Sequence, residues 1–484
     1  MSNISLKKNY IYSLSYQILN LITPLITAPY VARVLGADGV GIYSYTASIM
    51  IYFTMFGALG TMNYGTREIA RLRDDKKKMS NAFWGIVSIT CISSLICLLC
   101  WLILIYESTT YKYYFWALTP MLFATMADIS WFYTGIEKVS YTVIRNTICK
   151  FIGIALLFIF VNQKEDLFLY MIMNSVIQLV GNLSMWTYLP KLIDGIKISQ
   201  LNLLYHLKET MSYFVITIAI SLYTVLDKVL IGFITNDNFQ NGYYEQATKI
   251  INIAKTVSFA ALNSIMIARL SYLFEEKKYD EIHKKIAESL DCILIVSWGC
   301  IFGIIAVAKD FVPIFFGPGY EPVKFMLCLM APLIFVISLS TCLGSHYYLP
   351  AGMINKSTRM TIYGSILNLC INLLLIPKLG AVGAIIGTLV GESFISFIYI
   401  YNAGSYMSYG LIWAKSYKRI FAGCVMVLWG VLFSNYVGVY SFIMLFAQIF
   451  SCAIIYALVL LLLKDEKANK FIQLALLKLR KLEK

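Results

Sequence analysis

The sequence predicts an all-α membrane protein that crosses the bilayer many times. Of its 484 residues, 59% are hydrophobic and 14% are charged, and the mean hydropathy is +0.71. A soluble domain contains about 25% charged residues, so this composition indicates a protein that exposes most of its surface to lipid. The apolar residues are also grouped into runs of the length, roughly 20 residues, that a membrane-spanning helix needs.

Fourteen such runs follow one another along the chain. Turn signals separate several of them, including the glycine-rich stretch 36–41 and Gly317-Pro318-Gly319. The first run is too long for a signal peptide and is interrupted by Pro24 and Pro29, so we expect it to remain as the first span. The predicted spans cover 11–35, 40–63, 80–105, 113–134, 143–161, 167–189, 210–234, 243–267, 289–312, 323–349, 358–377, 381–403, 417–437 and 440–463.

The distribution of Lys and Arg predicts the orientation. With the N-terminus inside, the inner loops, helix ends and tail hold 31 of the 40 basic residues, and the outer connections hold five. Basic residues are retained on the cytoplasmic side of a membrane, so both termini are predicted to be cytoplasmic. Attraction to an anionic inner leaflet explains the net charge of +14, and no nucleic acid partner is expected.

A weak internal repeat predicts two lobes. Residues 242–250 (GYYEQATKI) resemble residues 41–49 (GIYSYTASI) at an offset of 201 residues. Two six-span halves related in this way enclose a site between them. We predict a first lobe at 1–190, a cytoplasmic linker at 191–209, a second lobe at 210–403, two extra spans within 404–463, and a basic amphipathic tail at 464–484.

A polar stripe in the eighth span marks a candidate site. At helical spacing Glu245, Lys249, Asn252, Lys255 and Asn263 fall on one face of an otherwise apolar helix. A charge at mid-membrane costs about 2.5–3.5 kcal/mol, so such residues usually face a wet cavity or a partner. The stripe therefore predicts a cavity lining.

Internal ion pairing is the alternative explanation of this stripe. Glu245 and Lys249 have the i,i+4 spacing of a helical ion pair, and Asp227 of the seventh span could pair with Lys255.

Charged residues also occur in other spans. Asp128 lies at a depth similar to that of Arg145 and Lys150, which predicts either a structural ion pair or a cytoplasmic gate. Glu392 lies near the middle of the twelfth span, and Arg33 lies near the end of the first. A basic side chain at that place either extends to the interface or lines a cavity. The first span has a polar face formed by Gln17, Asn20, Thr23 and Thr27.

Known catalytic patterns are missing from the sequence. It has no His, Cys and Asp grouping with metal-ligand spacing, no GxxxxGK phosphate loop and no Gly-x-Ser-x-Gly elbow. The 11 cysteines are scattered through the spans as small apolar residues. We therefore expect a transporter without a catalytic residue, a metal or a cofactor.

Three segments resemble Wzx-type polysaccharide flippases of the MOP superfamily, which also contains MATE exporters and lipid II flippases. They are Thr27–Gly41, Asp227–Gly232 and the hairpin at 368–384. The resemblance covers nearly the whole chain. It implies a MATE-like fold in which two six-helix lobes surround a central cavity, with two extra helices.

The resemblance also implies a cargo, an oligosaccharide repeat unit on undecaprenyl pyrophosphate. The protein would move this cargo by alternating access across a bacterial cytoplasmic membrane, for capsule, exopolysaccharide or O-antigen assembly. A cationic cavity would bind the diphosphate. The candidate diphosphate ligands are Lys249, Lys255, Arg33, Arg67 and Lys228. The candidates for sugar contacts are Asn252, Asn263, Tyr45 and Tyr64. The candidates for gating or for coupling to H⁺ or Na⁺ are Asp227, Asp128, Glu392, Glu245, Arg145 and Lys150.

Three other functions stay open at this point. A lipid II flippase carries the same diphosphate, and a MATE-type multidrug antiporter would be expected to rely on acidic rather than basic groups. A membrane-embedded glycosyltransferase or polymerase would be expected to have a large outer loop. The flippase hypothesis further predicts a polysaccharide polymerase and a chain-length regulator as partners.

Overall fold

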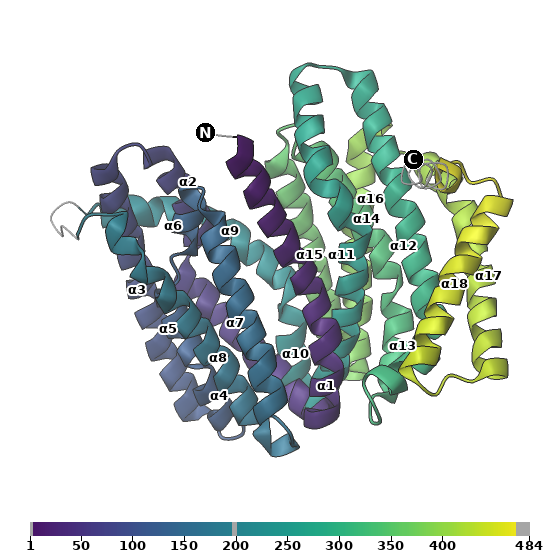
Figure 1. Cartoon of the computed structure of the whole chain (residues 1–484), viewed down its shortest axis with the longest axis horizontal. Coiled ribbons are helices and arrows are strands. Elements are labelled where there is room, and N and C mark those ends of the chain that lie inside the picture. The colour runs from purple at the N-terminus through teal and green to yellow at the C-terminus, as the bar shows by residue number, and fades with distance from the viewer. Residues whose placement is uncertain (1–2, 196–200, 471–484) are drawn as a thin grey trace. The chain divides into compact units, whose positions relative to one another are not determined.

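The computed structural model describes residues 3–195 and 201–470. Within these ranges the chain forms helices and no strand (Figure 1). Contacts divide it into two compact units, Met1–Gly242 and Tyr243–Lys484, called unit 1 and unit 2 below. The predicted lobes at 1–190 and 210–403, with the linker at 191–209, stay a prediction.

Unit 1 begins with α1 (Asn3–Ala58), which contains the first two predicted spans. Its two halves meet at Gly36, where φ is +70°. This left-handed conformation is strained for any residue with a side chain, so glycine is required at the bend. α2 (Thr61–Leu72) and α3 (Lys76–Glu107) follow.

The fourth predicted span consists of three short helices, α4 (Lys112–Leu118), α5 (Pro120–Met126) and α6 (Ser130–Gly135). Pro120 has no N–H and so begins a new helix. α5 ends at Met126, and Oδ1 of Asp128 accepts a hydrogen bond of 2.9 Å from the backbone N–H of Ser130, the first residue of α6. The chain between α5 and α6 is therefore a turn whose polar residues, Asp128 and Ser130, are partly buried.

The remaining helices of unit 1 include α7 (Val139–Phe160) and α8 (Leu167–Ser184), which line the candidate site described below. These two helices are packed against each other. α9 (Leu203–Thr224) and α10 (Leu226–Thr235) occupy the seventh predicted span. Buried aromatic side chains such as Phe83, Trp101 and Phe132 form the cores of this unit.

Unit 2 contains a long helix, Tyr279–Phe315, against which four other helices pack. α11 (Asn238–Glu275) begins in unit 1 and enters unit 2. α12 (Tyr279–Phe315) packs against α13 (Glu321–Met330), α14 (Pro332–Leu343), α17 (Tyr409–Val437) and α18 (Phe442–Leu462). α15 (Ile354–Leu379) and α16 (Ala381–Ala403) form a tight hairpin. A Cβ at Gly383 would lie 2.6 Å from the backbone carbonyl of Leu375, so this close approach requires glycine.

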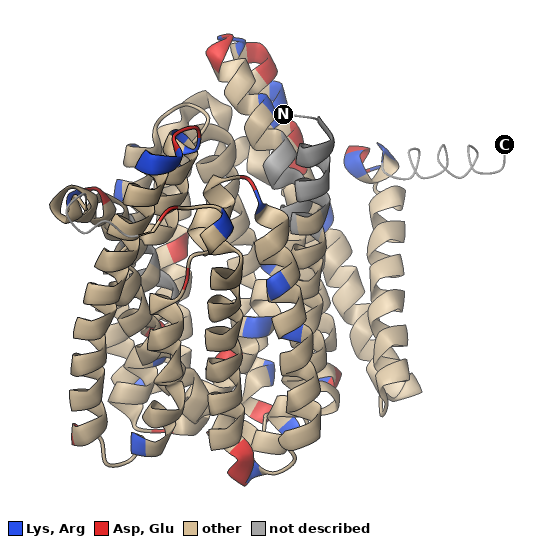
Figure 2. Cartoon of the chain, turned by 60° about the vertical axis from the view of Figure 1, so that its left-hand side comes forward, with Lys and Arg blue, Asp and Glu red and all other residues tan. Residues whose placement is uncertain are grey.

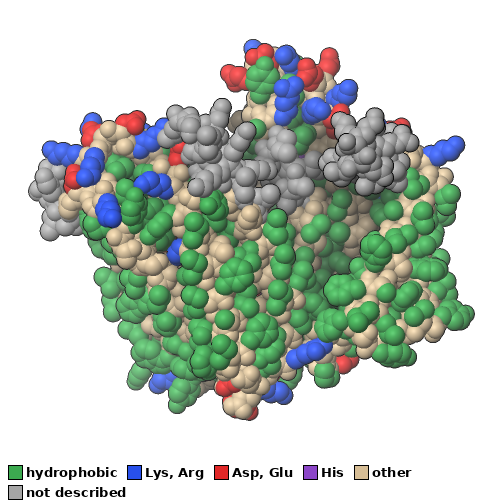
Figure 3. Space-filling view, viewed as in Figure 1, with side chains coloured by type: hydrophobic (Ala, Val, Ile, Leu, Met, Phe, Trp, Pro, Cys, Tyr) green, Lys and Arg blue, Asp and Glu red, His purple; other side chains and the backbone are tan. Residues whose placement is uncertain are grey.

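These helices confirm the multi-span, all-helical prediction. By length and composition, ten helices of the described residues are suited to crossing a membrane. One of the ten is the segment Ser15–Leu72, which contains two predicted spans. The number 14 stays a prediction. Hydrophobic side chains cover the flanks of the visible face, while acidic and basic residues gather mostly toward helix ends (Figures 2 and 3).

The first of the two extra spans, α17, contains a buried charge. Arg419 of α17 is 2% exposed and donates to Asp291 of α12 at 2.5 Å and to Asp465, which follows α18, at 3.1 Å. Lys415 adds an ion pair of 3.4 Å with Asp291. The guanidinium could be buried because two carboxylates neutralise it.

Replacing Arg419 by Met should destabilise the protein strongly. Two carboxylates would lose their main partner, and breaking a buried pair in this way costs about 3–5 kcal/mol. Unfolding in detergent, followed by helix content, measures this loss. Lys418→Met is the control, since Lys418 donates to a backbone carbonyl and its loss should cost about 0.5 kcal/mol. Equal stability of the two variants would contradict a structural role for the ion network.

Candidate functional site

Unit 1 contains a polar cavity of about 650 Å³, which we call the α7–α8 cavity. The face of α7 that lines it includes Arg145, Cys149 and Lys150, and the face of α8 includes Asn174 and Gln178. Residues three or four positions apart lie on one side of a helix, so each helix presents a continuous lining. The N-terminal half of α1 and the turn around Asp128 complete the lining.

Arg145 is fixed within this cavity by a neutral partner. Its Nη1 donates to Oδ1 of Asn182, and Nδ2 of Asn182 in turn donates to the carbonyl of Ala124 at 2.7 Å. The Nε of Arg145 is buried and has no hydrogen-bond partner among the described residues. A buried donor without a partner is costly, so this N–H is suited to donate a hydrogen bond to water or to an acceptor atom of a ligand.

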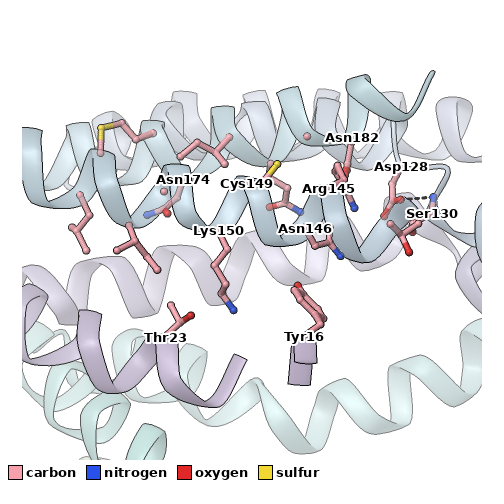
Figure 4. Close-up of a pocket in the computed structure, with 18 of the residues that line it drawn as sticks. Tyr16, Thr23, Asp128, Ser130, Arg145, Asn146, Cys149, Lys150, Asn174 and Asn182 are labelled. Atoms are coloured by element: carbon pink, nitrogen blue, oxygen red, sulfur yellow. Dashed lines mark hydrogen bonds between the residues drawn. The ribbon is translucent and has the colours of Figure 1, made fainter. Parts of the chain in front are cut away.

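Lys150 extends from α7 toward α1 (Figure 4). Its Nζ donates to Oδ1 of Asn20 and lies 5.7 Å from the ring centroid of Tyr16. Both contacts stabilise the ammonium without neutralising it. Because Arg145 and Lys150 are five residues apart, their Cα atoms differ by roughly 7.5 Å along the helix axis.

Asp128 lines the same cavity, but its carboxylate is hydrogen-bonded to the nearby backbone. Its carboxylate accepts from Ser130 N, and in residues 3–195 and 201–470 no ion pair joins it to Arg145 or Lys150. The predicted structural pair is therefore not formed in this conformation. Its predicted role in gating or ion coupling stays a prediction.

The polar face of the first span is confirmed where it lines the cavity. Thr23 and Thr27 both contribute to the lining, and their hydroxyls donate to Leu19 O at 2.7 Å and to Thr23 O at 3.0 Å within the helix. These bonds satisfy the hydroxyl protons and leave oxygen lone pairs toward the cavity.

Residues of the polar stripe on α11 lie in several environments. The predicted i,i+4 pair is confirmed, since Lys249 Nζ is 3.3 Å from Glu245 Oε1. Asn252 is exposed, Lys255 is partly buried, and the side chain of Asn263 lies outside the described residues. Asp227 and Lys255 belong to different units, so their pairing stays a prediction.

The remaining predicted ligands are dispersed through unit 1. Arg33 is exposed beside the Gly36 bend, while Asp227 is buried and its neighbour Lys228 is partly buried. Arg67 is exposed on α2 and donates to Tyr213 Oη at 2.8 Å. None of these residues lines the α7–α8 cavity among the residues described for it.

The predicted sugar-contacting tyrosines have protein partners. The ring of Tyr45 packs 5.1 Å from that of Tyr111, and the hydroxyl of Tyr64 is 2.7 Å from Nδ1 of His206. In unit 2, Glu392 is buried, and its Oε1 has no hydrogen-bond partner within the described part of the chain. No group of three or more His, Cys, Asp or Glu suited to a metal occurs among the described residues.

Sequence reasoning did not predict the uncharged polar residues that line the cavity. Asn146, Asn174, Gln178 and Asn182 line it, and they were not among the predicted site residues. A signal was present, because Asn174, Gln178 and Asn182 repeat at four-residue spacing on one face of an apolar helix.

The long apolar helices define a multi-pass membrane protein, and the family and relatives given next indicate a transporter rather than an enzyme. Residues 6–272 match the model of the family described as "Polysaccharide biosynthesis protein". That match covers more than half of the chain, which therefore belongs to this family. The predicted relationship to Wzx-type flippases of the MOP superfamily is confirmed.

Curated relatives agree with this assignment, and a solved structure has the same fold. The chain is 26% identical over 400 residues to a putative O-antigen transporter of Escherichia coli K12, covering 82% of this chain and 96% of the relative. It is 26% identical over 255 residues to a probable low-salt glycan biosynthesis flippase of Haloferax volcanii, covering 51% and 52% of the two chains. The inward closed lipid II flippase MurJ has the same fold, with a TM-score of 0.73 at 12% identity over 93% of this chain and 98% of that one.

Cysteine labelling can test whether the α7–α8 cavity contains water. Cys149 lines the cavity beside Arg145, whereas Cys342 and Cys452 are buried. A polar maleimide should modify Cys149 at least about 10-fold faster than the two buried thiols, because a reagent dissolved in the cavity can reach Cys149, whereas packing shields the other two. Mass spectrometry of digested protein measures the three rates, and unfolded protein is the control. A rate for Cys149 as slow as that for Cys342 would contradict a hydrated cavity.

Proposed function

We propose that the protein is a flippase for oligosaccharides linked to a polyprenyl diphosphate, with undecaprenyl pyrophosphate as the carrier. The observation that carries this proposal is the presence of Arg145 and Lys150 in one cavity, where their partners among the described residues are amide oxygens and not carboxylates. The names of the E. coli and Haloferax relatives support the transport of a glycan intermediate.

The chemistry of the cavity fits a diphosphate. A diphosphate carries negative charge and cannot enter hydrocarbon unaided. Arginine offers a planar set of donors to phosphate oxygens, and lysine adds a point charge. Such charge-assisted hydrogen bonds are stronger in a sheltered cavity than in water. A cationic drug would meet two positive groups here, which argues against a multidrug antiporter.

The transport cycle is also part of the proposal. We infer alternating access, with both chain termini in the cytoplasm of a bacterium because 31 basic residues lie in the predicted inner segments. Asp128, Asp227 and Glu392 are the candidates for coupling to H⁺ or Na⁺. A polymerase and a chain-length regulator are the proposed partners. A lipid II cargo would use the same cations, and competition between the two lipids would distinguish them.

Removal of both cavity cations should abolish transport. In vesicles that contain the purified protein, Arg145→Gln combined with Lys150→Gln should slow the transfer of a labelled polyprenyl diphosphate oligosaccharide by about 100-fold or more, because two charge-assisted hydrogen bonds are lost. Lys112→Gln with Lys164→Gln is the matched control, since both residues are exposed in unit 1 outside the cavity. Wild-type rates in the cavity variant would refute this assignment.

The α11 lysines make a separate prediction. Lys249→Gln combined with Lys255→Gln should abolish polysaccharide export in cells while the protein remains folded, if these residues bind the diphosphate during another step. Export is read from surface polysaccharide, and folding from the amount of protein in the membrane. Normal export in this variant would exclude the α11 lysines as ligands and leave Arg145 and Lys150 as the candidates.

A further inference from the structure

We propose that Asn146, Asn174 and Gln178 bind the carbohydrate part of the cargo and select neutral or acidic sugars over sugars that carry an ammonium group. We call these three residues the carboxamide row. The inference rests on the proposed function, since it assigns a second task to the same α7–α8 cavity.

The three carboxamides lie next to the cations. Asn174 and Gln178 are four residues apart on α8, so they project from the same face. Asn146 follows Arg145 on α7, and Figure 4 shows Asn146 and Asn174 on the two sides of Lys150 in this view. If Arg145 and Lys150 hold one group of a ligand, the neighbouring group of that ligand would therefore contact the carboxamides.

The row has unused hydrogen-bonding capacity. Asn174 donates from Nδ2 to Tyr170 O at 2.9 Å, which leaves its Oδ1 as an acceptor. Within the described residues, no hydrogen bond engages the carboxamides of Asn146 and Gln178. By contrast, Asn182 uses both ends of its amide to hold Arg145 and Ala124. Asn182 is thus a positioning residue, whereas the row is available to a ligand.

The chemistry of this capacity points to hydroxyl groups. Phosphate oxygens only accept hydrogen bonds, so the free acceptor of Asn174 cannot serve the diphosphate. Sugar hydroxyls donate and accept, and a carboxamide offers two donors and one acceptor in one plane. The row therefore complements a sugar, while the cations complement the diphosphate.

The charges around the row favour some sugars over others. Arg145 and Lys150 are two positive groups, and the single acid among the described lining residues is Asp128, whose Oδ1 is engaged by Ser130 N. An ammonium on a sugar near Lys150 would be repelled, because like charges in a sheltered site disfavour each other strongly. Hydroxyl, N-acetyl or carboxylate groups do not have this cost.

Binding to three synthetic lipids tests the inference. The probes are a short polyprenyl diphosphate without sugar, the same lipid with an N-acetylhexosamine, and the same lipid with a hexosamine that has a free amine. Native mass spectrometry of the full-length protein in detergent gives the three affinities. The wild type should prefer the N-acetylhexosamine lipid to each of the other two by about 10-fold, the value of one or two hydrogen bonds.

The variants separate this inference from the proposed function. Asn174→Ala and Gln178→Ala should each reduce the preference for the N-acetylhexosamine lipid over the bare lipid by about 3- to 10-fold. Asn402→Ala on α16, outside the lining, is the control. Equal preferences in wild type and both variants, or equally tight binding of the free-amine lipid, would overturn the inference. Failure of the wild type to bind any of the diphosphates would instead overturn the proposed function.

Discussion

A charged group that enters an apolar interior must be neutralised, hydrogen-bonded or hydrated, and this requirement explains where the side chains of this protein lie. Arg419 is neutralised by two aspartates and is structural. Lys249 is paired with the glutamate one turn before it. Arg145 and Lys150 satisfy the same requirement differently, because they bind the amide oxygens of Asn182 and Asn20.

The choice between carboxylate and amide partners divides structural cations from functional ones. A carboxylate removes the positive charge, and the pair then offers little to an anion. An amide oxygen orients the cation and leaves its charge in place. Asn182 therefore prepares Arg145 for a ligand, and Gly181 beside it allows α7 and α8 to approach, since a Cβ there would lie 2.7 Å from Cys149 Sγ. Gly181 thus allows close packing of the two helices, and its neighbour Asn182 leaves the charge of Arg145 available to a ligand.

Local sequence patterns predicted most of the fold and only part of the site. Apolar runs located the helices, and the polar face of the first span is visible as spacing. The partners of Arg419 lie 128 and 46 residues away, and Asn182, the partner of Arg145, lies 37 residues away, so no local pattern reveals them. The carboxamides of α8 were overlooked for another reason. Asn174, Gln178 and Asn182 carry no charge, so they stand out less from an apolar helix than Lys or Asp does.

The position of Asp465 has a consequence for how the chain is assembled. Arg419 lies in the first half of α17, and one of its two aspartates follows α18. During synthesis, the guanidinium cannot acquire this partner until the final hairpin has been made and the next residues have left the ribosome. Insertion of α17 and α18 should therefore be completed late and as one event, and a chain that terminates before Asp465 should be recognised by membrane quality control as unfinished.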